Sequence, residues 1–235
     1  MKILSIDTSS NNCSIAVVDE KAMLGEININ YNLQHSVLLM PLIEELLTRL
    51  DMKPNDLDAL TLSTGPGSFT GLRIGLSAVK GMALGSNLPI YAADALSILA
   101  YGVYGYHGIL VPMIDALRGG YYTGFYTFEN GKLITLMEPV ILTLDEVKEK
   151  LAEEENDILI LGDITDKKTD DELLFKEKVS IAPSSLNIPK ASNIPYLLWE
   201  RILSGKSDDI HSLVPVYMRK SQAEYEYEKK IGMLK

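Results

Sequence analysis

Reactive side chains are scarce in this sequence of 235 residues, which has one cysteine and three histidines. The lone Cys13 excludes an intrachain disulfide and any metal site made of several thiolates, which fits a reducing compartment. His35, His107 and His211 are far apart, and none is followed three or four residues later by a His, Asp or Glu, the spacing of a helical metal pair. Neither a Gly-x-Ser-x-Gly elbow nor a His-Glu-x-x-His motif occurs. We therefore predict no catalytic residue, no metal ligand and no cofactor.

Long apolar runs and dense basic runs are also missing. The opening apolar run, Ile3 to Ile6, is too short for a signal peptide or a membrane span, so we expect a cytoplasmic protein without a membrane partner. The chain has 32 acidic against 22 basic residues and a formal net charge of -10. This is the wrong sign for neutralising phosphates, so the composition disfavours direct nucleic-acid binding by the isolated chain.

What is present is typical of a folded protein, with 46% apolar and 23% charged residues. The first part predicts three short strands, then a helix, a strand, a second helix and a strand. This order is typical of an RNase H-like lobe, whose parallel strands need helical crossovers. The predicted elements are Lys2–Asp7, Cys13–Val18, Ala22–Ile29, the helix Ser36–Leu50, Leu57–Ser63, the helix Thr70–Leu84 and Ile90–Ala92.

The same order then begins again, which predicts two duplicated lobes, residues 1–104 and 105–235, joined near Gly102 to Gly108. Asp163 to Lys178 is charged and weakly periodic, so we predict a mobile surface excursion there. A late amphipathic helix from Ile194 to Leu203 can dock back on either lobe. The other predicted elements of the second lobe are Ile109–Ile114, Tyr121–Phe128, Leu133–Leu136, the helix Leu144–Glu153 and Ile158–Leu161.

Two turns are candidates for holding phosphate. Asp7-Thr8-Ser9-Ser10 follows the first strand, where hydroxyls and free amides can bind an anion, but the same residues also simply cap turns. Gly65 to Arg73 reads Gly-Pro-Gly-Ser-Phe-Thr-Gly-Leu-Arg before a helix, where amides can bind an anion or glycine can serve a tight reversal. The candidate residues of this phosphate loop are Asp7, Thr8, Ser9, Gly65 and Gly67.

Two predicted helices carry unusual patterns. Gly71, Gly75 and Gly81 each cost about 1 kcal/mol of helix propensity, which a close approach of another backbone can offset, in a partner or in this chain's own sheet. The apolar residues of Ser36–Leu50 spread over roughly 200°, beyond the roughly 100° that one core needs, so a second surface is required, in another protein or in this chain. We predict a docking face made of Leu38, Leu39, Leu42, Leu46, Gly71 and Gly75.

Several of these segments together resemble the TsaB (YeaZ) family. The segments are Ile3–Ser9, Gly65–Gly75 with Ala78-x-Lys80-Gly81, and more loosely Ile114-Asp115-Ala116, Arg118-Gly119, Tyr122, Pro215–Arg219 and Ala223. The resemblance implies an α/β protein with the actin-like ATPase (ASKHA) fold, built of two RNase H-like lobes. The stretch between Asp163 and Ile194 matches no pattern of the family.

The resemblance also implies a role. The catalytic relative, TsaD, binds its metal with two histidines four residues apart, and the matching positions here are Ala95 and Leu99. The chain then resembles a non-catalytic scaffold that docks TsaD for threonylcarbamoyl transfer to N6 of the adenosine following the anticodon in ANN-decoding tRNAs. The implied partners are TsaD, the ATPase TsaE, a second copy when TsaD is absent, and tRNA only through the complex.

An alternative function is an enzyme of the same fold, either an ATP-binding small-molecule kinase or a peptidase. A carboxylate or metal pair beyond Asp7 would favour it, and the sequence shows none. An independent nucleic-acid-binding module is opposed by the acidic balance.

Overall fold

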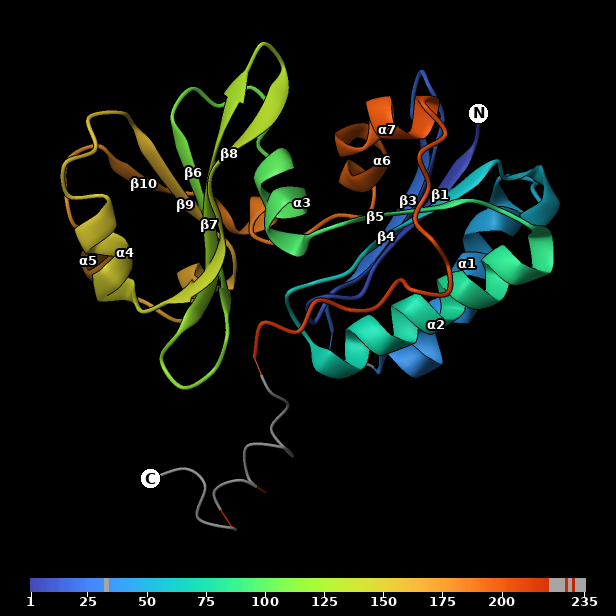
Figure 1. Ribbon diagram of the computed structural model, residues 1–235, viewed down its shortest axis with the longest axis horizontal. Coiled ribbons are helices and arrows are strands. Elements are labelled where there is room, and N and C mark those ends of the chain that lie inside the picture. The colour runs from blue at the N-terminus through green and yellow to red at the C-terminus, as the bar shows by residue number, and fades with distance from the viewer. Residues whose placement is uncertain (32–33, 220–226, 228–229, 231–235) are drawn as a thin grey trace.

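The computed structural model describes residues 1–31, 34–219, 227 and 230. It contains two five-stranded sheets with the same topology, one in each lobe (Figure 1). In the first, β1 (Ile3–Asp7), β2 (Cys13–Val18) and β3 (Met23–Ile29) form an antiparallel meander, and β4 (Ala59–Ser63) and β5 (Ile90–Ala93) continue in parallel. The strand order is β3-β2-β1-β4-β5. The predicted Ala223 lies outside the described residues.

The second sheet repeats this arrangement and confirms the predicted duplication. Its strands are β6 (Ile109–Asp115), β7 (Tyr121–Glu129), β8 (Lys132–Leu142), β9 (Ile158–Leu161) and β10 (Val179–Ile181). The order β10-β9-β6-β7-β8 has an antiparallel meander, β6 to β8, and two parallel strands, as in the first lobe. The chain therefore has the predicted α/β architecture of two RNase H-like lobes.

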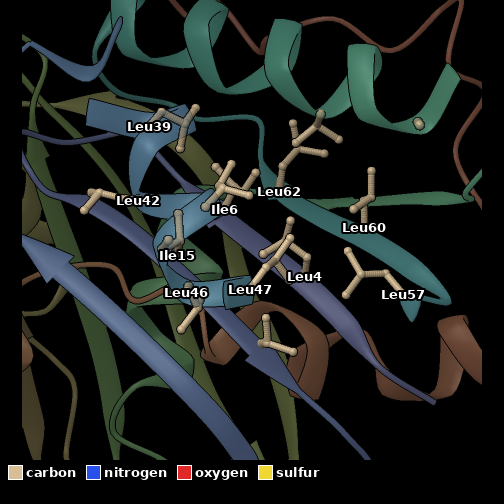
Figure 2. Close-up of a cluster of buried hydrophobic side chains, with 14 of the residues drawn as sticks. Leu4, Ile6, Ile15, Leu39, Leu42, Leu46, Leu47, Leu57, Leu60 and Leu62 are labelled. Atoms are coloured by element: carbon tan, nitrogen blue, oxygen red, sulfur yellow. The ribbon is translucent and has the colours of Figure 1, made fainter. Parts of the chain in front are cut away.

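Two long helices cover one face of the first sheet. They are α1 (His35–Arg49) and α2 (Phe69–Ser86). Between them in the chain lie the short 3-10 helix η1 (Pro54–Asp56) and β4. The Ser68 side chain caps α2 by accepting a hydrogen bond from the Gly71 amide at 3.2 Å. The apolar sides of both helices pack on Leu4, Ile6, Leu60 and Leu62 of the strands (Figure 2).

The second lobe has helices on both faces. On one face lie α4 (Leu144–Lys150), η2 (Asp163–Asp166) and α5 (Asp170–Leu173), and on the other lie α3 (Ala95–Tyr101) and η3 (Ser184–Leu186). The prediction of a surface excursion from Asp163 was wrong in one respect. Ile164 and Leu173 are fully buried and join the core of this lobe, because apolar residues recur within the charged stretch.

The late helix is two short helices, α6 (Asn193–Leu197) and α7 (Trp199–Leu203), and both dock on the first lobe. Ile202 packs with Ile3 and Ala16, and the Ala191 amide donates to Ser14 Oγ at 2.8 Å. Conversely, α3 packs on the sheet of the second lobe. The lobes are therefore not separated at residue 104 alone. By their contacts, α3 belongs to the second lobe, and α6 and α7 belong to the first. Among the described residues, no helix is long and apolar enough to span a membrane.

Candidate functional site: the interlobe cleft and the two-helix face

A cleft of about 420 Å³ lies between the two lobes. Its first-lobe wall is formed by the loop after β1, residues 9–12, and by the turn before α2, residues 67–69. Its second-lobe wall is formed by the loop after β6 and by residues near η2. Ligands of open α/β sheets bind outside the carboxyl ends of such strands, so this cleft is where a ligand of this fold would lie.

Asp7, at the end of β1, uses one carboxylate oxygen inside its own loop. Its Oδ1 accepts hydrogen bonds from the Ser9 amide at 2.9 Å and from the Ser9 hydroxyl at 2.8 Å. Its Oδ2 is buried and accepts no hydrogen bond of normal geometry from the described residues, although Ser63 and His35 lie near enough to favour the charge. Burial raises the pKa of Asp7, against the hydrogen bonds from Ser9 that lower it.

The other predicted phosphate-loop residues are also held by contacts within the chain. Thr8 Oγ1 donates to the Gly71 carbonyl at 2.8 Å, and the Ser68 amide donates to the Ser9 carbonyl at 2.7 Å. A Cβ atom at Gly67 would lie 2.0 Å from the Ser9 carbonyl oxygen, so the turn needs glycine to approach the first loop. Gly65 has a φ of +94°, the left-handed region that favours glycine. The structure thus brings Asp7, Thr8, Ser9, Gly65 and Gly67 together. The Ser9 amide and hydroxyl donate to Asp7 within the same loop, and the Thr8 hydroxyl donates to Gly71.

The second-lobe wall contains a charge cluster that sequence reasoning missed. Lys167 Nζ lies 2.7 Å from Asp115 Oδ2 and 3.2 Å from Asp163 Oδ2. Burial lowers the pKa of Lys167, but the hydrogen bonds and charges of the two carboxylates outweigh it, so the pKa is raised. Of these three residues, only Asp115 lies in a segment that resembles the TsaB family. Lys167 and Asp163 lie 48 or more residues away from it in the chain, and only the fold brings them together.

The positions that the resemblance predicts to match the metal-binding histidines of TsaD are both in a hydrophobic core. Ala95 and Leu99 lie on α3 with exposures of 0% and 1%, packed with Leu110 and Tyr126. Alanine and leucine have no atom that ligates a metal. Among the described residues, no group of three His, Cys, Asp or Glu side chains is placed to hold a metal ion.

The leucines predicted for a docking face are mostly inside this chain's own core. Leu39, Leu42 and Leu46 have exposures of 1%, 8% and 4% and pack against the strands (Figure 2), and Leu38 is half-buried beside them. Since α1 contacts β2, β3 and α2, most of the broad apolar arc is covered within the chain, and Met40 at its edge stays exposed. In the folded chain, these three leucines are not accessible to a partner.

The two glycines of the predicted docking face have an internal explanation as well. A Cβ atom at Gly71 would lie 2.1 Å from the Thr8 carbonyl oxygen, and one at Gly75 would lie 2.3 Å from Thr8 Oγ1. Both glycines therefore allow α2 to approach the end of β1. The sequence left open whether these glycines allow the approach of a partner's backbone or of the chain's own sheet. At Gly71 and Gly75, the neighbour is the chain's own Thr8, at the end of β1.

The outer face of the same two helices is apolar and carries small residues. Val37 and Met40 of α1 are 66% and 50% exposed, and Leu84 of α2 is 67% exposed. On α2, Gly81 and Gly85 are exposed, and a Cβ atom at either would meet no atom within 4 Å. Nothing within the described chain uses the space beside these two glycines. Helical spacing alone does not separate the two pairs, because at 100° per residue Gly81 lies about 120° from Gly75 but Gly85 lies within about 40° of Gly71.

Comparisons with known proteins agree with the architecture. The model of the TsaD family, tRNA N6-adenosine threonylcarbamoyltransferase, matches residues 25–227. The TsaB protein of Bacillus subtilis, described as a tRNA threonylcarbamoyladenosine biosynthesis protein, is 35% identical over 95% of this chain and 96% of its own length. The TsaB protein of Escherichia coli is 27% identical, with coverage of 95% and 96%.

Among solved structures, YeaZ from Pseudomonas aeruginosa superposes with a TM-score of 0.79 at 24% identity, covering 92% of this chain and 99% of that chain. This likeness shows the shared fold, the actin-like ATPase fold with two lobes. The level of identity to the Bacillus subtilis protein, over nearly the whole length of both chains, shows the family. This chain therefore belongs to the TsaB (YeaZ) family of tRNA threonylcarbamoyladenosine biosynthesis proteins.

Proposed function

We propose that this chain is a non-catalytic subunit that docks TsaD through the outer face of α1 and α2, and so supports threonylcarbamoyl transfer to N6 of the adenosine following the anticodon in ANN-decoding tRNAs. The family membership supports the pathway. We further propose that TsaE joins this assembly, that a second copy occupies the same face when TsaD is absent, and that tRNA binds only through the complex, in the cytoplasm.

The observation that carries the docking proposal is the pair of open glycines on α2. Each helical glycine costs about 1 kcal/mol relative to alanine. Among the described residues, no atom lies within 4 Å of where a Cβ atom at Gly81 or Gly85 would be. Glycines four residues apart let another helix approach closely. Exposed Val37, Met40 and Leu84 supply apolar surface on the same two helices. A partner's helices, packed on this face, would bury both features.

The proposed lack of catalysis is supported by the polar side chains of the cleft, which form hydrogen bonds and ion pairs with other groups of this chain. The Ser9 amide and hydroxyl are bound to Asp7, and the Thr8 hydroxyl is bound to Gly71. Asp115 and Asp163 are both paired with Lys167, whose single positive charge offsets part of their negative charge. These groups would have to break their present bonds to hold a nucleotide phosphate or its metal ion, which weighs against the kinase-like and peptidase alternatives.

Gel filtration of this chain mixed with TsaD tests the docking proposal. Gly81→Leu places a bulky side chain in the open space, and we expect it to weaken complex formation by about tenfold or more, equivalent to about 1.4 kcal/mol. Leu203→Glu is the matched control, because Leu203 is 64% exposed on α7, outside this face. A folded Gly81→Leu variant that binds TsaD as well as the control does would overturn this docking face.

A further inference from the structure

The chain crosses between the lobes twice at neighbouring places. The first crossing leads from β5 into α3, and the second lies between Asn187 and Ala191. Asn187 belongs to the second lobe, where its Oδ1 accepts from the Gly162 amide at 3.0 Å, and Ala191 is buried in the first lobe. The two crossings touch, since Asn193 of α6 lies 3.4 Å from the Ile98 carbonyl oxygen of α3. Adjacent connections of this kind permit two lobes to hinge about them.

A third crossing is made by Val214–Arg219, a segment that we call the strap. On the first lobe, the Val216 amide donates to the Thr64 carbonyl at 2.9 Å. The Tyr217 ring stacks on Phe69, with 4.6 Å between ring centroids, and its hydroxyl accepts from Arg73 Nε at 2.8 Å. The Arg73 guanidinium lies 3.9 Å from the centre of the Phe69 ring, so the ring pair and the cation form one cluster.

On the second lobe, the next two residues of the strap are bound. Met218 packs on the core beside α3, and Arg219 Nη1 donates to the carbonyls of Ala116 and Leu117. These carbonyls belong to the turn between β6 and β7, where Leu117 and Arg118 have φ values of 61° and 56°. Non-glycine residues rarely adopt this conformation, so Arg219 holds a strained turn.

The position of the strap gives these contacts a mechanical consequence. Figure 1 shows it leaving the first lobe beside the start of α2, well below α3 and α6. Its residues Val216, Tyr217 and Arg219 line the interlobe cleft. Attachment at two separated places removes the rotation that a single hinge allows. We propose that the strap is an interlobe clamp, which holds the cleft at one width and makes the two lobes move as one body.

The clamp differs from an enzyme cleft that opens and closes around its ligand. A cleft held at one width presents α2, where Phe69 and Arg73 lie, in a constant position relative to the second lobe. The inference concerns the isolated chain and does not depend on which partner docks on the helices.

Distance measurements between spin labels on the two lobes test the clamp. Asn55→Cys in η1 and Glu149→Cys in α4 place one exposed label on each lobe. Cys13 does not compete for the reagent at neutral pH, because burial raises the pKa of its thiol to about 11. We expect a single narrow distance distribution for the otherwise unchanged chain.

In this background, Tyr217→Ala combined with Arg219→Ala removes the bound side chains from both lobes. We expect the distribution to broaden and the rate of proteolysis within residues 187–191 to rise about tenfold, because cleavage follows the population of open forms. A narrow distribution at the original distance, with unchanged proteolysis, would overturn the clamp.

A milder pair of variants decides the question if the double alanine variant loses its folded circular dichroism spectrum. Tyr217→Phe keeps the ring on Phe69 and removes the acceptor of Arg73, and Arg219→Lys keeps the charge and removes the forked geometry. Together they are expected to broaden the distribution to a smaller extent. If the distances stay narrow and unchanged in this folded variant, the strap does not hold the lobes.

Discussion

At the scale of single residues, four glycines of one helix have two different roles. Gly71 and Gly75 are buried against Thr8, and Gly81 and Gly85 face open space. All four reduce helix propensity by similar amounts, so composition alone does not separate them. The separation comes from what lies beside each glycine, which is Thr8 for Gly71 and Gly75 and no described atom within 4 Å for Gly81 and Gly85.

Alanine substitutions at two of these glycines should therefore have opposite effects on stability. Gly75→Ala places a methyl group 2.3 Å from Thr8 Oγ1, which is fixed by its hydrogen bond to Gly71, and we expect a loss of about 1–3 kcal/mol. Gly81→Ala meets no atom within 4 Å and should gain about 1 kcal/mol from helix propensity. Chemical denaturation measures both. Equal changes in the two variants would contradict the packing described.

Asp7 is the residue whose ionisation should affect stability most clearly. Burial raises the pKa of Asp7 in the folded chain, so its contribution is fully present below the ordinary value of 3.8 and is lost as pH rises through the folded value. Asp7→Asn keeps an oxygen for the two hydrogen bonds from Ser9 and removes the charge. We expect the variant to be more stable than wild type at pH 7, because it removes a buried charge.

The difference between Asp7→Asn and wild type should shrink as pH falls, because wild-type Asp7 then becomes neutral in the folded state. Thermal melts of both proteins at a series of pH values provide the measurement. Asp19→Asn is a control of opposite sign, because the Lys21 and Ala22 amides lower the pKa of Asp19 and the variant should be less stable than wild type at pH 7. A difference that is constant with pH would show that the Asp7 charge does not govern the effect.

At the scale of elements, α1 has an inner side that forms the core and an outer side that is free in the described chain. Leu42 faces inward with 8% exposure and Met40 faces outward with 50%. The two positions are two residues apart, so opposite sides of the helix are expected to respond differently to the same substitution.

Leu42→Glu should unfold the isolated chain, because a buried charge without a partner costs several kcal/mol. Met40→Glu should leave stability within about 0.5 kcal/mol of wild type and should reduce association with TsaD and with a second copy. Circular dichroism and gel filtration on the same samples separate folding from association. The docking face would lose its support if folded Met40→Glu assembled normally.

At the scale of the whole molecule, charge decides which partners the chain can approach alone. The formal net charge of -10 repels a polyanion, so we expect the isolated chain to bind tRNA weakly and the complex with TsaD to bind it better. A titration at several salt concentrations measures this. Tight binding by the isolated chain that weakens steeply with salt would reveal a phosphate-contacting surface.

Much of the architecture could be predicted from the sequence, because alternation and helical periodicity are local. The first-lobe strands and long helices were predicted within a few residues, and the repeat of their order in the second lobe was predicted too. β8 runs to Leu142 rather than Leu136, and the short helix α3 was not predicted. β10 and α5 were missed, since short elements in a charged stretch have no clear period. The single late helix was predicted where α6 and α7 form, because their apolar pattern runs on across the junction at Leu198.

The sequence by itself determined the family, through motifs such as Gly65–Gly75, and it predicted that Ala95 and Leu99 replace the metal-binding histidines of TsaD. It also determined that α1 needed two covered sides. Only the tertiary structure decided that the chain's own sheet and α2 cover Leu39, Leu42 and Leu46, and that Gly81 rather than Gly75 faces outward. The physical reason is that periodicity shows how broad an apolar face is, but the identity of what covers it depends on contacts between residues distant in the chain.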